Sequence, residues 1–295
     1  MYVNGRDCTI AIITPDHKIV IPYSEETIRE DIALLQEKAP VEGDGICRAI
    51  RRHAGVTGCI VTPLTIGAVP VLLSLVMGSS SIPVYVSETK NLYLHTLYLL
   101  PMEESASFGL AQYRGGQQRL YEMCRVKGFE LRVMRNDAIK LKLDVCGEST
   151  SIAYHSTEKA QSQTSEMSGT VIGERFNGDN VAYKINGLEY RNIYGITLAV
   201  SKDSGIKSEL WIKRVLTTGQ ELPQVINEMI ITMQLQRVNN EHRHFGSISI
   251  NLKKLVLVSD ETNVNSADAV MGPLRYYVSD SVGISIVTAN EKAIV

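Results

Sequence analysis

Strict alternation of apolar and polar residues is the strongest pattern in this chain. Between Phe129 and Val145, apolar residues take every second position on both sides of the turn Arg135–Asn136–Asp137. Period-two patterning over this length predicts two half-buried strands in an antiparallel pair. We expect one face of the pair to lie on a core and the other to face water or a partner.

The same alternation returns in the second half of the chain, at 196–200, 231–236 and 248–253. Since alternate strand residues point to opposite faces, the apolar phase predicts these buried residues: Leu131, Val133, Leu141, Leu143, Met233, Leu235, Ile250 and Leu252. The polar phase of the same strands gives the candidates for the face that meets water or a partner: Arg132, Lys140, Lys142, Asp144, Thr232, Gln234, Gln236, Ser249, Asn251 and Lys253.

Other local signals predict a small hairpin and a few short helices. Apolar alternation around Thr14–Pro15–Asp16 predicts a hairpin or an extended arm within residues 1–23. Ser24, as an N-cap, predicts a helix that ends at Pro40, and residues 45–54 predict a second. Residues 70–77 predict a third, with Pro70 at its start and Gly78 just past its end. A short helix is also predicted near Pro223.

A polar segment divides the chain into two halves. Nine of the twenty residues from 149 to 168 are Ser or Thr, and such a segment buries too little apolar surface to form a core. We predict an N-terminal β-domain over 1–148, a polar linker over 149–168 and a C-terminal β-domain over 169–295. The order of elements suggests an internal duplication, although no repeat is visible residue by residue.

Composition and charge exclude several classes of function. The 295 residues include 44% hydrophobic and 21% charged residues, and the net charge is −2. This balance gives no dense basic footprint for tight nucleic-acid binding. The apolar stretch from Ile66 to Met77 is too short to span a bilayer, and the N-terminus lacks the pattern of a secretory signal. With five cysteines that lack tight pairing, we expect reduced thiols, buried at Cys124 and Cys146.

Candidate chemical motifs each have a simpler interpretation. His242 and His244 have the i, i+2 spacing of two metal ligands on a strand, but a polar turn explains them better. Gly43–Asp44–Gly45 lacks the third glycine of a phosphate loop. Arg48, Arg51 and Arg52 are interpreted as a solvated helix end, with an acidic neighbour or DNA as the alternative. The acidic residues from 259 to 268 lack the spacing of a calcium loop. We therefore expect no catalytic site, metal or cofactor.

A set of residues in the first half resembles the major tail (tail tube) proteins of tailed bacteriophages and prophages. The resemblance is carried by Tyr93, His95, Thr96, Phe108, Gly115, Gly116, Tyr121, Gly128–Phe129–Glu130–Leu131, Leu141, Leu143–Asp144 and Gly147. It covers roughly residues 60–148, and residues 169–290 more loosely. The resemblance implies a mainly β fold with a few short helices: two tail-tube-like antiparallel β-sandwich or barrel domains, whose strands join a shared oligomeric β-barrel.

The resemblance also implies a function. Such proteins form homo-oligomeric rings, here of three two-domain chains or of six chains, which stack through arms and long loops. The stacked tube conducts DNA non-specifically to the host and contacts other tail proteins. It belongs to the virion tail and is assembled in the host bacterial cytoplasm. The alternatives are the inner tube of a contractile injection or secretion particle and a β-sandwich binding module. One departure is that the polar face of the first hairpin leans basic, whereas tube interiors lean acidic.

Overall fold

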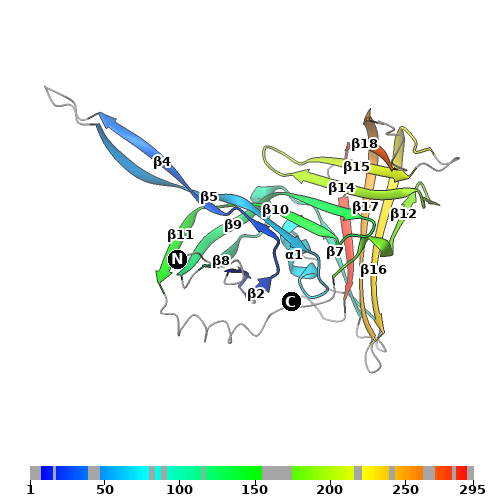
Figure 1. Ribbon diagram of the computed structural model, residues 1–295, viewed down its shortest axis with the longest axis horizontal. Coiled ribbons are helices and arrows are strands. Elements are labelled where there is room, and N and C mark those ends of the chain that lie inside the picture. The colour runs from blue at the N-terminus through cyan, green and yellow to red at the C-terminus, as the bar shows by residue number, and fades with distance from the viewer. Residues whose placement is uncertain are drawn as a thin grey trace.

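The described residues fold mainly into antiparallel strands, with one α-helix packed against them (Figure 1). The computed structural model describes residues 8–15, 18–38, 47–79, 84–87, 92–114, 117–154, 175–215, 221–238, 243–261, 270–280 and 284–290. Within this part of the chain the α-helix is α1 (Val69–Met77), and 3₁₀ turns occur at Met102–Glu104 and Gly178–Asn180. The prediction of a mainly β fold is therefore confirmed.

The strands of the first half are β1 (Cys8–Ile13), β2 (Lys18–Ile21), β3 (Glu25–Glu26), β4 (Arg29–Lys38), β5 (Cys47–Pro63), β6 (Val84–Ser87), β7 (Leu92–Tyr98), β8 (Phe108–Arg114), β9 (Gln117–Met134), β10 (Lys140–Gly147) and β11 (Ser149–Tyr154). Those of the second half are β12 (Val181–Ile185), β13 (Leu188–Glu189), β14 (Ile193–Ser201), β15 (Lys207–Val215), β16 (Val225–Val238), β17 (Arg243–Asp260), β18 (Val270–Val278) and β19 (Ile284–Asn290).

Strand β9 connects a small sheet to a large one. Its first residues pair with β8 and β11, and β8 continues through β1 to β2. Its later residues pair with β10 and β14, which extend the large sheet to β5 on one side and to β15, β18 and β17 on the other. Met123, with φ of 52°, lies where β9 passes between these partners. Positive φ strains a non-glycine residue and marks a local bend in the strand.

The large sheet branches at β17 because this strand is long enough to serve two sets of neighbours. Its first half lies between β16 and β19, and β19 leads to β7 and β6. Its second half pairs with β18, while β16 continues on its outer side to β12 and β13. Strands from both halves of the sequence thus pair directly, β9 with β14 and β7 with β19. The predicted division into two domains stays a prediction.

The core lies under one face of this sheet. Paired positions on neighbouring strands form a buried row that consists of Leu141, Leu131, Leu198, Leu210 and Tyr276. Helix α1 is apolar almost all round and is buried against β9 and β7, as its composition requires. Pro70 lies in its first turn and Gly78 ends it with φ of 81°, so the prediction for this helix is confirmed.

Most predicted core positions are also confirmed, since Leu131, Val133, Leu141, Leu143, Met233, Ile250 and Leu252 are buried. The side chain of Leu235 lies outside the described part. The predicted hairpin at the N-terminus is present, with Ile10 opposite Ile21 and Ile12 opposite Ile19. The alternation places Met134 in the polar phase of β9, yet this residue is buried as well.

Three helix predictions are wrong. Residues 24–38 form β3 and β4, and residues 47–54 belong to β5; Pro40 and Gly43–Gly45 lie outside the described residues. β4 and β5 pair from Arg29 opposite Thr57 to Lys38 opposite Cys47, so cross-strand hydrogen bonds override the helix-like local signals. The helix near Pro223 is absent, because β16 begins at Val225 and pairs along its length with β17. This removes one argument for duplication.

The first six residues of the predicted linker form a strand. Ser149–Tyr154 form β11 and pair with the beginning of β9, from Ser149 opposite Glu122 to Tyr154 opposite Gln117. A polar sequence can form an edge strand because backbone hydrogen bonds do not depend on apolar side chains. Residues 155–168 lie outside the described part of the chain.

Candidate functional site

The exposed face of the large sheet gathers the polar residues that the sequence predicted separately. Residues paired across antiparallel strands share a face, so the registers can be followed from strand to strand. One row across the exposed face contains Lys140, Arg132, Thr197, Trp211 and Arg275. The next row contains Lys142, Glu130, Ala199, Glu209, Tyr277, Val256 and Val225.

The second group of predicted residues lies on β16 and β17. Thr232 is opposite Ser249, with their hydroxyl oxygens 3.5 Å apart. Asn251 donates from Nδ2 to Glu228 at 2.9 Å, and Glu228 is opposite Lys253. Gln234 is exposed opposite Ser247. For Gln236 the structure describes the backbone pairing with Phe245 but not the side chain.

These positions therefore belong to one sheet, although the sequence places them in two halves. Arg132, Gln234 and Lys253 are exposed, while Lys140, Lys142, Asp144, Thr232, Ser249 and Asn251 are half-buried. Sequence analysis missed Glu209, Trp211, Arg275 and Tyr277 on the same face. For Glu209 and Trp211 an alternating pattern was present in residues 207–215. There the buried Ser208, Leu210 and Ile212 alternate with residues of the exposed face.

Several basic residues of this face are paired with acids of the same chain. Lys140 lies 3.2 Å from Asp137, and Lys142 lies 3.4 Å from Asp144. The hydrogen bond from Lys140 lowers the pKa of Asp137. Partial burial opposes charge on Lys142, but Asp144 outweighs it and the pKa of Lys142 is raised. The excess of basic residues that the sequence indicates for this face is therefore partly neutralised by acids of the same chain.

Arg275 makes the best-defined ion pair of this face. Its Nε and Nη2 donate to the two carboxylate oxygens of Glu209, at 3.2 and 2.5 Å. The guanidinium carbon also lies 5.8 Å from the ring centroid of Trp211. A planar guanidinium fits both a carboxylate and an aromatic face. The three side chains form a neutral, organised cluster beside Tyr277.

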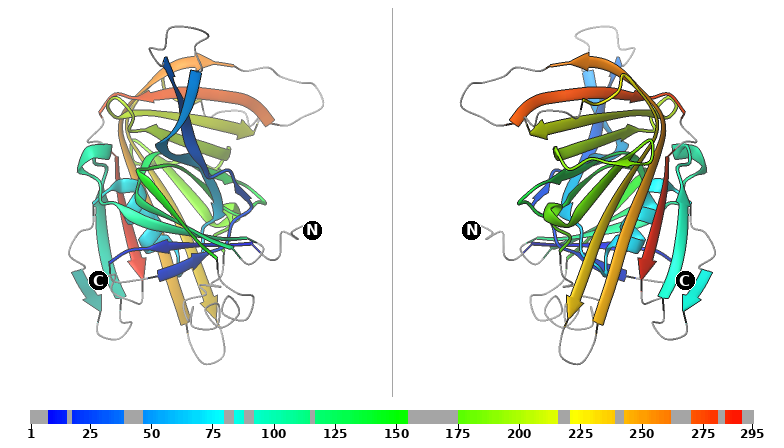
Figure 2. Two further views of the ribbon diagram at one scale, coloured as in Figure 1. Left: turned by 90° about the vertical axis from the view of Figure 1, so that its left-hand side faces the viewer. Right: turned by 90° about the vertical axis from the view of Figure 1, so that its right-hand side faces the viewer.

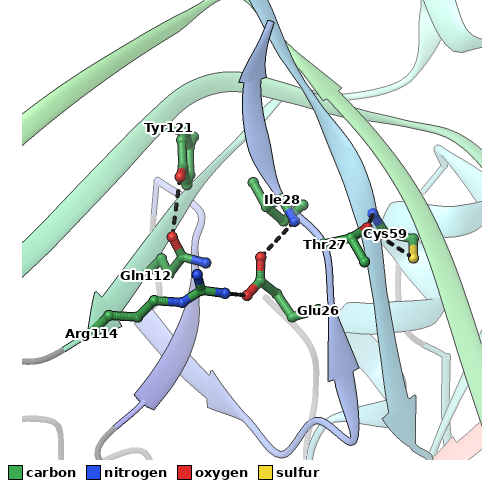
Figure 3. Close-up of polar contacts among 7 residues, drawn as sticks. All are labelled: Glu26, Thr27, Ile28, Cys59, Gln112, Arg114 and Tyr121. Carbon is green, nitrogen blue, oxygen red and sulfur yellow. Dashed lines mark hydrogen bonds and ion pairs between the residues drawn. The ribbon is translucent and has the colours of Figure 1, made fainter. Parts of the chain in front are cut away.

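A second candidate site is the base of the β4–β5 hairpin, which projects from the body at one end of the long axis (Figures 1 and 3). Glu26 on β3 forms an ion pair with Arg114 on β8 and accepts a hydrogen bond from the Ile28 backbone N–H at 2.5 Å. The Glu26 side chain is only 2% exposed. A buried carboxylate is stable only when it is paired and hydrogen-bonded, so these contacts tie the hairpin base to the small sheet.

Thr27 joins the two strands at the same place. Its backbone N–H donates to the Cys59 carbonyl at 3.0 Å, and its hydroxyl accepts from the Cys59 N–H at 3.0 Å (Figure 3). A Cβ on Gly58 would lie 2.6 Å from backbone atoms of Thr27 and Ile28. Only glycine permits this close approach. A bulge at Asp31/Ile32 follows, and beyond it the hairpin leaves the sheet.

We expect Arg114→Met to lower the free energy of unfolding by about 1–3 kcal/mol, because the buried Glu26 carboxylate loses its counter-charge. Urea denaturation of the variant and of Arg191→Met, a change at an exposed arginine, measures the difference. Adding Glu26→Gln to Arg114→Met should recover part of the loss. Equal stability of Arg114→Met and the Arg191→Met control would contradict the structural role of this pair.

Lys202 is the most unusual ionisable residue of the described chain. It is 0% exposed, and its Nζ donates to the Ser105 hydroxyl at 3.2 Å. Burial lowers its pKa to about 8, since desolvation disfavours the charged form. A serine beside a lysine is also found in nucleophilic sites, but Ser105 is itself buried and its hydroxyl donates to the Pro101 carbonyl at 2.9 Å. The contact therefore links the β14–β15 turn to the segment before β8.

The other residues that the sequence suggested for metal binding or thiol chemistry do not come together in one site. Among the described residues no three His, Cys, Asp or Glu side chains form a group that could hold a metal ion; His242, Thr262 and Asp268 lie outside them. Cys124 and Cys146 are free thiols, and Cys124 is buried as predicted, whereas Cys146 is only half-buried. Burial raises the pKa of Cys124 to about 12. Since Cys146 pairs with Arg125, the next residue along from Cys124, the two thiols lie on opposite faces. Arg48, Arg51 and Arg52 lie on β5, so the interpretation as a helix end is wrong.

Comparison with known proteins adds no assignment. No protein-family model matches the chain, and no curated protein matches it. In the described residues, no helix combines the length and the hydropathy that a membrane crossing requires.

Proposed function

We propose that the protein is a structural subunit of a phage or prophage tail, and that its rings stack into the tube that conducts DNA to the host. The observation that carries this proposal is the large antiparallel sheet with one apolar, buried face and one polar, exposed face. A sheet of this length with open edges invites pairing with another chain unless the edges are covered. A closed ring of identical subunits covers them and lines a lumen with the polar face.

The character of the exposed face supports a passage rather than a binding site. Its Lys140, Lys142 and Arg275 are each within ion-pair distance of a carboxylate of the same chain. Tight DNA binding requires cations that are free to neutralise phosphates. A face on which these three cations are already paired suits a polyanion that must slide past without being held. The charge of this face therefore differs less from the acidic interior of tail tubes than the sequence indicates.

The β4–β5 hairpin supports stacking between rings. It extends away from the body (Figure 1), and in the described part of the chain β4 packs mainly against β5. An isolated two-stranded hairpin is at best marginally stable in water. A contact with the next ring would supply the missing packing, in the role of the arm that tail tube proteins use.

The proposal predicts defined assembly. Light scattering after size exclusion should give masses that are multiples of 32.6 kDa, with three or six chains per ring, and polymer at high concentration. Negative-stain electron microscopy of the same fractions should show rings or tubes. A strictly monomeric protein at every concentration and salt would overturn the proposal.

A further inference from the structure

Arg214 is a buried arginine without a counter-charge in the described part of the chain. It follows Leu210 and Ile212 in the buried phase of β15, so it lies on the core side of the sheet and is 9% exposed. Within the described residues no carboxylate lies within ion-pair distance of its guanidinium, and its Nε has no hydrogen-bond partner. Arg114 and Arg275, by contrast, each have a carboxylate of the same chain.

A buried guanidinium without a partner is energetically unfavourable. Arginine keeps its proton in proteins, so its charge cannot be removed by deprotonation. Charged groups that are taken out of water are stable only when they are paired and hydrogen-bonded. Water can supply a hydrogen bond but neutralises none of the charge. The surroundings of Arg214 are therefore incomplete until an anion reaches them.

The polar groups near Arg214 do not supply that anion. β15 lies between β14 and β18 (Figure 2), and Tyr276 of β18 lies close to the guanidinium. Burial raises the pKa of Tyr276 to about 12, and the positive charge of Arg214 opposes this rise. The Tyr276 hydroxyl donates to the Pro223 carbonyl at 2.9 Å. Asp260 also acts on Tyr276, but it is exposed and is not within ion-pair distance of Arg214.

The loops next to this end of β15 contain a single acidic residue. Residues 216–220, which follow β15, contain no Asp or Glu. Residues 262–269, which lead into β18, contain Asp268 alone, and this loop lies outside the described residues. Asp268 is therefore the acid of these loops that requires a variant of its own.

We propose that Arg214 binds an oxyanion, a carboxylate or phosphate group from outside the chain, at the end of the core beside Tyr276. A guanidinium fits both groups because its planar fork donates two parallel hydrogen bonds to two oxygen atoms. The site lies on the core side of the sheet, opposite the exposed face that contains Lys140 and Arg132, so it is independent of the proposed passage of DNA. A bound anion would stabilise the folded state, because the unfolded chain lacks the site.

Thermal unfolding with sodium phosphate or sodium acetate, each compared with sodium chloride at equal ionic strength, tests the site. The melting temperature of the wild type should rise to a plateau, with a gain of about 2–4 °C at tenfold excess over Kd. Arg214→Met should lose this gain and should be at least as stable as the wild type in chloride, because methionine has no charge to desolvate. Lys213→Met removes the same charge from the other face of β15 and should keep the gain.

Isothermal titration calorimetry with the same two anions measures the affinity. Arg214→Lys keeps the charge but loses the fork, and should bind about tenfold more weakly. The anion that binds more tightly identifies the occupant as a phosphate or a carboxylate group.

Three results would overturn the inference. The first is a wild type without a saturable gain, and the second is an equal gain in Arg214→Met. The third is an equal loss of stability in chloride for Arg214→Met and Asp268→Asn, which would show that Asp268 already pairs with Arg214. Should Arg214→Met not fold, the titration of Arg214→Lys decides, and an affinity equal to that of the wild type contradicts the site.

Discussion

Leu141→Ala will lower the free energy of unfolding by about 2–5 kcal/mol, the range for a leucine truncated in a packed core. Leu141 is 0% exposed and is the first residue of the buried row. It is opposite Leu131 on β9 and opposite Thr62 on β5, so β10 is held on both sides. Its surroundings cannot collapse into the space without breaking the register of these strands, which places the expected loss well inside this range.

Urea denaturation, followed by fluorescence and circular dichroism, measures this loss. Lys142→Ala is the matched control, because Lys142 is the next residue on β10 and points to the exposed face. Surface changes of this kind usually alter stability by about 0.5 kcal/mol or less. If Leu141→Ala costs no more than Lys142→Ala, the assignment of the two faces of β10 is reversed.

The contribution of Lys202 to the free energy of unfolding will rise with pH between about 8 and 10.5. Burial lowers the pKa of Lys202 from 10.5 to about 8. Between these values the unfolded chain binds a proton that the folded chain does not, so raising the pH favours the folded state. The full difference of pKa corresponds to about 3 kcal/mol. This contribution is present above the unfolded pKa and is lost as the pH falls through the folded value.

The variant Lys202→Met should abolish this rise and should be more stable than the wild type near neutral pH, because methionine has no charge to desolvate. Stability curves from pH 7 to 10.5 for the variant, the wild type and Lys184→Met supply the comparison. Lys184 is exposed on β12, so its replacement should leave the slope unchanged. Parallel curves for the wild type and Lys202→Met would show that Lys202 is charged and solvated in the folded protein.

Local sequence predicted the elements whose pattern has one interpretation. The β9–β10 hairpin has alternation on both strands and a turn at Asn136, whose φ of 63° suits asparagine. Helix α1 has a proline at its start and a glycine at its end, and no strand partner competes for its backbone. In these segments the local preferences and the long-range pairing agree.

The same reasoning failed where local and long-range signals disagree. Ile28, Ile32 and Leu35 have helical spacing, yet Ile32 and Leu35 pair with His53 and Ile50 of β5. Pairing of β4 with β5 supplies cross-strand hydrogen bonds along the whole of β4, and no window of ten residues contains that information. The role of Glu26 was invisible for the same reason, because its partner Arg114 lies on β8.

The sequence by itself determined which residues face the core and which face outward along each strand, because side-chain alternation has a fixed period of two. Only the tertiary structure decided which strands are neighbours. It placed Lys140, Arg132, Trp211 and Arg275 in one row and brought the buried Lys202 to Ser105. The physical reason is that register depends on the sum of pairings between distant segments, whereas alternation depends on the geometry of one strand.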